Sequence, residues 1–369
     1  MTIQNEIVNR GIRHAVYFQQ VSNREVALMV KFLEEKLLPD LKETLRRRLE
    51  RGAFNNRIDS PTTRRYQKLI RDLEAKIASG MKELNIESVR RLRKLGMLEA
   101  NWASQSLAQT MPFDITFNSI SLPTVNSIIK SKPFEGQFLK DWYSGLGKRT
   151  SQRVAKELSI GLASGESPEK ITRRLMGARD GRFAGRGPLG GELRRNVRTI
   201  VRTAANHVAA HAREAVYEAN KDVIEKVRWL SVLDHRTSDF CMSEDGQEYK
   251  INEGPRPPAH HQCRSTTIPV TKSWKDLKIG KGGQEIRIGG RAYRSYGPDL
   301  KSSFTRVSAD GDLTYGTWLK SQPYHVQKAV LGTTRARLFR DGEISFDRFF
   351  DSGKMISLRR LARLENISL

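Results

Sequence analysis

Apolar residues recur at intervals of three and four positions through the first half of the chain. This spacing marks one face of an α-helix, which turns about once every 3.6 residues. Two such stripes are Val30, Leu33, Leu37, Leu41, Leu45 and Leu49, and Tyr66, Leu69, Ile70, Leu73 and Ile77. A third helical pattern covers residues 85–109. The first half is therefore predicted to consist of amphipathic helices.

Polar and proline residues predict where some of these helices begin or bend. Ser22 and Glu25 have the spacing of a capping box, which predicts a helix start. Pro39 interrupts the first stripe and predicts a kink or a break. Ser167 followed by Pro168 predicts the N-terminus of a further short helix.

The central part contains two more helical patterns, over 134–162 and 192–220. Two prolines and several β-branched residues between 111 and 125 predict a linker ahead of them. The glycine- and arginine-rich segment 177–191 lacks the Gly-Lys-Ser/Thr ending of a phosphate-binding loop. A mobile basic loop is the better interpretation, and contact with a DNA backbone is the weaker one.

The pattern changes after residue 222. β-Branched residues, an Asp245-Gly246 turn and a second extended run near 266–270 predict short antiparallel strands. The predicted fold class is mainly α, with a small mixed α/β module and a short helical C-terminal extension. The predicted regions are a variable helical 1–130, a helical 131–222, the module at 223–272, and a linker and helical extension at 273–369.

The charge of the chain points to polyanionic partners. Lys and Arg total 65 against 41 Asp and Glu, which gives a net charge of +24. Such a field favours nucleic acid or an anionic membrane surface. No apolar run reaches the roughly 18 residues of a membrane span, and the first twenty residues lack the pattern of a secretory signal, so neither a membrane span nor secretion is expected. The residues predicted to contact DNA are Arg46, Arg47, Arg48, Arg194, Arg195, Arg198 and Arg202.

His207 and His211 have the spacing of a zinc-protease helix. That motif needs a glutamate directly after the first histidine as general base, and Val208 stands there instead. The two histidines are therefore interpreted as packing residues.

A stronger set of candidate ligands lies in the module at 223–272. Asp234, Cys241, Cys263 and either His260 or His261 are the ligand types that tetrahedral Zn²⁺ prefers. The prolines of "RPPAHHQC" stiffen the approach to the closing cysteine. The alternatives are a buried thiol pair beside surface histidines, a cysteine nucleophile with a histidine base, and an HNH-type nuclease. The nuclease frame needs a helix after the cluster, where the sequence predicts an extended run.

The motifs of this region resemble those of the Mu F-type minor head, or head morphogenesis, family of tailed phages. The resemblance rests on "VRWLSVLDHRTSDFCMSEDGQEY" and "RPPAHHQCRSTTIPV", preceded by "RTIVRTAANHVAAHAREAVYEAN", and extends over about 134–351. Besides the four candidate ligands, its motif positions include Trp229, Arg236, Thr237, Gly246, Pro257, Pro258 and Arg264. Ser238 and Ser265 stand where the family often has further cysteines.

The resemblance implies a structural and assembly protein of the phage head. Such a protein is not an enzyme and has no small-molecule substrate. It would lie inside the virion near the portal, after assembly in the host cytoplasm. Its partners would be the portal or major capsid protein and double-stranded DNA, with no membrane partner.

The resemblance also implies one structural Zn²⁺, held by Asp234, Cys241, His260 and Cys263, the family pattern favouring His260 over His261. Arg264 is expected to pair with Asp234 or Glu244. The alternative function is a metal-dependent nuclease, or another nucleic-acid enzyme, built on the His/Cys module.

Overall fold

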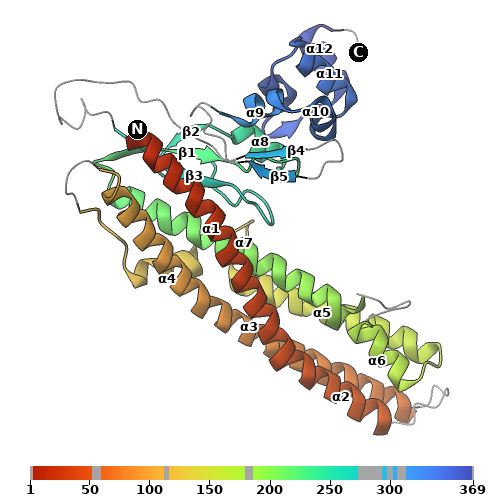
Figure 1. The fold of residues 1–369 in the computed structure, drawn as a ribbon. Helices are drawn as coiled ribbons and strands as arrows, with labels where there is room; N and C mark the ends of the chain where they lie inside the picture. Colours follow the sequence, from red (N-terminus) through yellow and green to blue (C-terminus); the bar gives the residue numbers. More distant parts are fainter. Residues whose placement is uncertain are drawn as a thin grey trace, which may run out of the picture. The chain divides into compact units, whose positions relative to one another are not determined.

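The computed structural model describes residues 3–51, 60–111, 116–178, 186–272, 293–296, 302–305 and 313–367. The predicted fold class is confirmed, because the chain is mainly helical with a small antiparallel sheet (Figure 1). Two compact units divide the chain. One contains Met1–Gln19, Met97–Ser121 and Ala209–Leu369, and the other contains Gln20–Gly96 and Leu122–Val208. The linear region boundaries predicted from the sequence remain predictions.

The helices of the second unit carry the predicted apolar stripes. Its elements come from α1 (Ile3–Phe32), a π-helical turn (Leu33–Leu37), α2 (Leu38–Arg51), α3 (Ser60–Ala108), α4 (Leu122–Ser131), α5 (Leu139–Ala163), α6 (Pro168–Met176) and α7 (Glu192–Ala219). Helices α1, α3 and α7 also contribute to the first unit. The predicted stripes are buried at Leu33, Leu41 and Leu45 and again at Leu69 and Ile77.

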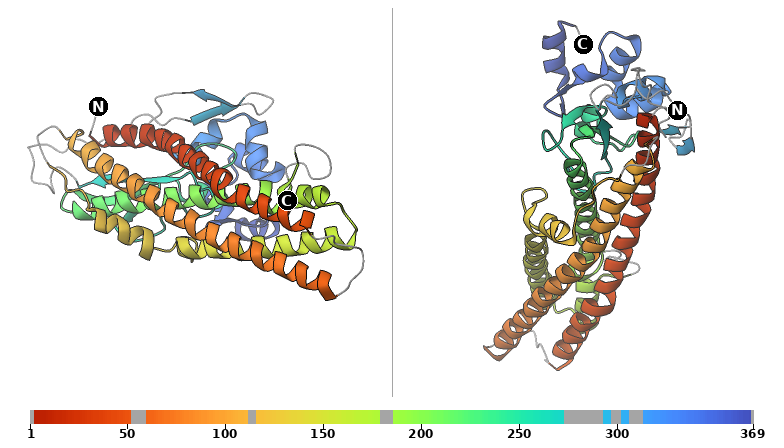
Figure 2. Two further views of the ribbon diagram at one scale, coloured as in Figure 1. Left: turned by 90° about the horizontal axis from the view of Figure 1, so that it is seen from below. Right: turned by 90° about the vertical axis from the view of Figure 1, so that its left-hand side faces the viewer.

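Some predicted helix boundaries are wrong. Ser22 lies inside α1, which begins at Ile3, so it does not cap a helix. The chain does not break at Pro39, which lies in α2 directly after the π-helical turn Leu33–Leu37, and the predicted kink there stays a prediction. The patterns on either side of Gly80 belong to the single helix α3 of 49 residues (Figure 2). A Cβ on Gly80 would lie 2.4 Å from Leu37 Cδ1, so this glycine serves close packing.

The glycine-rich segment is partly packed. Residues 179–185 of the predicted loop lie outside the described residues. Gly187–Gly191 forms a second π-helical turn, and Pro188 and Leu189 are buried. A Cβ on Gly190 would meet the Met176 carbonyl oxygen at 1.8 Å, which requires glycine there.

The predicted N-terminus of the short helix α6 is confirmed, because the Ser167 side chain accepts from the Lys170 amide.

The first unit contains the predicted sheet. Strand β1 (Ile224–Leu230) lies between β2 (Glu248–Lys250) and β3 (Thr266–Thr271), and both pairings are antiparallel. Helix α8 (Asp239–Glu244) connects β1 to β2. A buried apolar cluster joins α1, α3 and α7 to β1, and its members include Ile7, Ala100, Leu107, Val216, Tyr217 and Val227.

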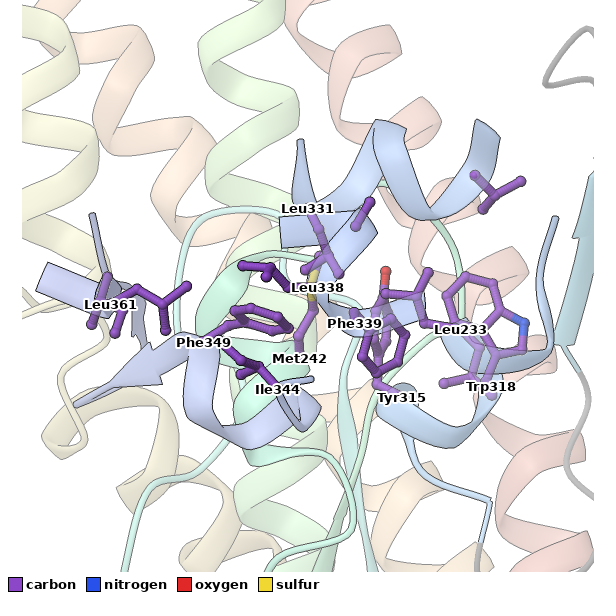
Figure 3. Close-up of a cluster of buried hydrophobic side chains, with 14 residues drawn as sticks. Leu233, Met242, Tyr315, Trp318, Leu331, Leu338, Phe339, Ile344, Phe349 and Leu361 are labelled. Carbon is purple, nitrogen blue, oxygen red and sulfur yellow. The ribbon is translucent and has the colours of Figure 1, made fainter. Parts of the chain in front are cut away.

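The C-terminal part of this unit has a core of its own. Its elements are the hairpin β4 (Tyr293–Tyr296) and β5 (Ser302–Thr305), then α9 (Tyr315–Ser321), α10 (Tyr324–Leu331), α11 (Thr333–Asp341), a 3₁₀ turn (Phe346–Phe349), β6 (Phe350–Asp351), β7 (Lys354–Met355) and α12 (Leu358–Glu365). Tyr315, Trp318, Leu338 and Phe349 fill the middle of this core (Figure 3). The core also includes Leu233 and Met242, which are sequence neighbours of the predicted ligands Asp234 and Cys241.

Candidate metal centre

Three of the four predicted ligands lie together. The Cys241 Sγ atom is 3.3 Å from His260 Nε2 and 3.7 Å from Cys263 Sγ. The three ligand atoms all lie within 4.8 Å of one another. Both cysteines are free thiols and are buried, and His260 is half-buried. This group could hold a metal ion.

Local structure brings these side chains together. Ser238 caps α8 by accepting from the Cys241 amide, which fixes the first turn and the direction of the Cys241 thiol. On the other side, the Cys263 amide donates to the His260 carbonyl at 3.1 Å and closes a tight turn. Gln262 takes a positive φ of 59° inside that turn. The spacing "HxxC" therefore presents an imidazole and a thiol to the same point.

The hydrogen bonds of His260 define its tautomer. The Nδ1 atom lies 2.9 Å from the His261 carbonyl oxygen, which can only accept, so Nδ1 carries the proton. In the neutral ring Nε2 then presents its lone pair to Cys241 Sγ and to Ser238 Oγ, which is 2.9 Å away. A metal-binding histidine has this arrangement, with the far nitrogen held by a carbonyl. His261 is exposed and lies outside the cluster.

The two thiols differ in acidity. The hydrogen bond from Cys241 lowers the pKa of Cys263, and hydrogen bonds with backbone groups of Ala259 and Ser265 act in the same direction against burial. The same Cys263 interaction and burial raise the pKa of Cys241. Of the two sulfurs, Cys263 Sγ is therefore the more acidic and accepts the hydrogen bond from Cys241.

The spacing of the donor atoms fits a tetrahedral ion. Zinc bonds of about 2.3 Å to sulfur and about 2.05 Å to nitrogen give tetrahedral edges of roughly 3.8 Å between two sulfurs and roughly 3.6 Å between sulfur and nitrogen. The observed separations are 3.7 Å and 3.3 Å. The distances from Cys241 Sγ to the other two donor atoms are thus close to those that tetrahedral zinc requires.

Asp234 does not join this group. Its carboxylate accepts from both terminal nitrogens of the Arg264 guanidinium, and its Oδ1 atom also accepts from the Arg236 amide at 3.0 Å. Burial raises the pKa of Asp234, but the Arg264 hydrogen bonds outweigh burial and hold it below its usual range. Arg264 therefore pairs with Asp234 and not with Glu244. These hydrogen bonds already engage the Asp234 carboxylate.

Other motif residues support the cluster from β1 and the turn after α8. Trp229 is fully buried and donates from Nε1 to Ser231 Oγ at 2.9 Å, and Ser231 Oγ donates to the Cys241 carbonyl at 2.6 Å. Gly246, with φ at 88°, donates to the Trp229 carbonyl at 3.0 Å. Thr237 donates to the Val232 carbonyl.

Arg256 positions the proline loop, and the sequence analysis did not predict this role. It donates from Nε to Glu214 on α7 at 2.5 Å and from its terminal nitrogens to the Glu253, Pro255 and Lys250 carbonyls. The cis Pro257–Pro258 bond follows directly. No local pattern marks Arg256, because its partner Glu214 lies 42 positions away in the sequence.

A second set that the sequence did not reveal is a buried ionic cluster in the first unit. Glu99 on α3 is fully buried, lies 2.9 Å from His14 Nε2 on α1, and accepts from Arg213 on α7. Arg213 also donates to Thr266 Oγ1 in β3 at 3.0 Å. His14 stacks on Trp102 with ring centroids 3.5 Å apart.

The two histidines of α7 are accounted for by packing and pairing. His207 Nε2 lies 3.2 Å from the Lys132 carbonyl, and its ring contacts Phe134. His211 lies 3.5 Å from Glu214. Neither belongs to a metal-capable group among the residues that the structure describes.

The predicted DNA-contacting arginines differ in their availability. Arg46 pairs with Glu43, Arg48 with Asp72, and Arg194 with Glu34. Arg202 donates to Asn23 Oδ1 at 2.8 Å, and Arg195 also has an interaction. Arg47 and Arg198 are exposed, and within the described ranges neither forms an ion pair.

The comparisons with known proteins agree with the motifs. Residues 152–268 match the family described as Phage Mu protein F like protein. The resemblance predicted from the sequence is thus confirmed over these residues, a shorter segment than the 134–351 expected. No curated protein and no solved structure matches the chain. None of the described helices has the length and apolar character needed to cross a membrane.

Proposed function

We propose that this chain, which carries a Mu F-like domain at residues 152–268, is a minor head protein that acts inside the phage head. The family match carries this proposal, because the family implies a structural head protein and a place in the virion. The proposed location is near the portal, with portal or major capsid protein as neighbours. The net charge of +24 supports a position against packaged DNA.

The proposed contact with DNA is independent of sequence. Exposed arginines such as Arg47 and Arg198 would neutralise phosphates and release counterions, so affinity would fall steeply with salt. The experiment is a titration of unrelated duplexes over a range of salt concentrations. Equal affinity for unrelated sequences and a steep salt slope are expected. An affinity that does not change with salt would overturn this part of the proposal.

The proposed cofactor is one structural Zn²⁺ held by Cys241, His260 and Cys263. The fit of the donor spacing and the lone pair of His260 support it. Bound zinc would bridge the two thiols and would link the loop before Cys263 to α8. Because this module is small, such a staple would contribute directly to its folding.

Elemental analysis of protein purified without added zinc tests the metal. About one zinc per chain is expected, and Cys263→Ser should lose the metal and melt at a lower temperature. Folded wild-type protein that contains no zinc and takes up none when zinc is added would overturn the zinc proposal and leave the head assignment intact.

A direct test of the function is to locate the protein. Mass spectrometry of purified particles, of DNA-free heads and of the released genome fraction should find the chain inside the head. Plasmid incubated with the protein and Mg²⁺, Mn²⁺ or Zn²⁺ should stay intact. Cleavage that disappears in His260→Ala and His261→Ala would replace the structural assignment with a nuclease.

A further inference from the structure

The second unit has a groove of about 720 Å³ between α3 and α5. The helices are antiparallel here, because Tyr143 lies 2.6 Å from Ser88 near one end, whereas Tyr66 reaches the Ala155 carbonyl at the other. The groove residues of α3 and α5 recur at intervals of three and four, so each helix contributes one face. It lies outside the proposed metal centre.

The floor of the groove is apolar, whereas most of the other lining residues are polar or charged. Met81 and Tyr143 are buried, and Gly147 lets α5 approach α3. A Cβ on Gly147 would lie 3.0 Å from Met81 Cγ, so a larger residue would push the helices apart. Ile86 borders the groove with its side chain 67% exposed, the most exposed large apolar residue among those described. Ile86 thus offers an apolar contact beside the floor, next to the charged groups of the rim.

The rim of the groove is cationic. Lys82 on α3 and Lys140 and Lys148 on α5 line it and are exposed. Within the part of the chain that the structure describes, none of these lysines forms an ion pair. Glu74 is the one carboxylate among the described lining residues.

We propose that this groove binds an acidic amphipathic helix of a partner protein. The floor would take the apolar face of that helix, and the lysine rim would face carboxylates beside it. The apolar floor argues against duplex DNA as the occupant, because phosphates gain nothing from apolar side chains and would leave Ile86 exposed. This inference is separate from the metal and DNA proposals and survives if either fails.

The test uses a synthetic, fluorophore-labelled peptide helix with leucine at every third or fourth position and glutamates beside them. Its anisotropy should report saturable binding to the full chain. The variant K82E/K140E/K148E should weaken binding by about tenfold, because three modest ion pairs become three repulsions. The matched control K68E/K94E/K156E changes the same charge at exposed positions of α3 and α5 outside the groove. It should bind almost as the wild type does.

A second pair of variants tests the groove itself. Ser144→Trp fills it from an exposed position of α5, and Ser79→Trp places the same side chain on α3 outside it. Circular dichroism and the melting temperature confirm that both remain folded. Loss of peptide binding in Ser144→Trp alone supports the proposal. Equal loss in both lysine triples, no saturable binding, or loss of DNA binding in the groove triple alone would overturn it.

Discussion

Asp234 and Arg264 form a buried bidentate ion pair beside the thiols. The Asp234 side chain is fully buried, and the guanidinium meets both of its oxygens. The Asp234 carbonyl also accepts from the Tyr315 hydroxyl at 2.8 Å. One residue therefore connects the end of β1, the loop after Cys263 and the first helix of the C-terminal core.

Removing Arg264 should destabilise the protein strongly. Arg264→Met leaves the Asp234 carboxylate buried without its cation, which typically costs about 3–5 kcal/mol in the free energy of unfolding. Denaturant unfolding measures the change. The double variant Asp234→Asn/Arg264→Met should recover part of the loss because the buried charge is gone. If the single and double variants unfold alike, the unpaired carboxylate is not the cause of the loss.

Metal binding should not depend on the Asp234 carboxylate. Asp234→Asn should bind Co²⁺, a spectroscopic substitute for zinc, with the same sulfur charge-transfer bands as the wild type. Cys241→Ser and Cys263→Ser should each lose part of that absorption, and His260→Ala should weaken binding. A folded Asp234→Asn variant that binds no Co²⁺ would restore the carboxylate to the ligand set.

Ser238→Cys should strengthen metal binding and weaken the metal-free protein. Ser238 Oγ lies 2.9 Å from His260 Nε2, so a thiol there would add a third sulfur to the cluster. The expected gain in metal affinity is on the order of tenfold. The lost cap on α8 should cost about 1 kcal/mol without metal. Ser238→Ala is the control, since it removes the cap and adds no ligand. Equal metal affinities in Ser238→Cys and Ser238→Ala would show that residue 238 does not reach a bound metal.

Acid should loosen the loop that Arg256 holds. Burial would raise the pKa of Glu214, but the His211 hydrogen bond and the Arg256 charge outweigh it and lower the pKa to about 2. The depressed folded pKa gives stability above the ordinary value of 4.5 that is lost as pH falls toward 2. The difference amounts to about 3 kcal/mol. Glu214→Gln should therefore flatten the acid limb of the stability curve, whereas Glu218→Gln, at a more exposed carboxylate of α7, should not.

The apolar spacing was sufficient to predict the helices and their buried faces. Leu33, Leu41 and Leu45 are buried because a period near 3.6 leaves no other face for them. The spacing could not show that α3 is one helix, because the predicted patterns over 66–77 and 85–109 are separated by Gly80, which is needed where Leu37 packs against the helix. The capping-box spacing at Ser22 likewise predicted a helix start, but the helix around Ser22 continues through this position.

The ligand set could be predicted only in part. The residue types predicted a group of Cys241, His260 and Cys263, and the structure brings these three side chains together. Asp234 has the right chemistry for a ligand, but its carboxylate faces Arg264, and side-chain direction is not encoded in residue type. Glu99 and Arg213 are 114 positions apart, so no local pattern connects them.

The ionic cluster around Glu99 should be essential to the first unit. Glu99→Leu removes the acceptor of both His14 and Arg213 and leaves a guanidinium buried without a counter-charge. The expected loss is about 3–5 kcal/mol in the free energy of unfolding. Glu83→Leu, an exposed position of the same helix, should change it by less than about 0.5 kcal/mol.

A second substitution separates lost pairing from lost packing in that cluster. If the buried charge is the cause, Glu99→Leu/Arg213→Met should be more stable than Glu99→Leu alone, because no guanidinium stays unpaired. If instead Arg213 matters through its bond to Thr266 in β3, the double variant should be the less stable one. Hydrogen exchange of the β3 amides distinguishes the two causes. Only loss of the Arg213 bond to Thr266 requires faster exchange in this strand.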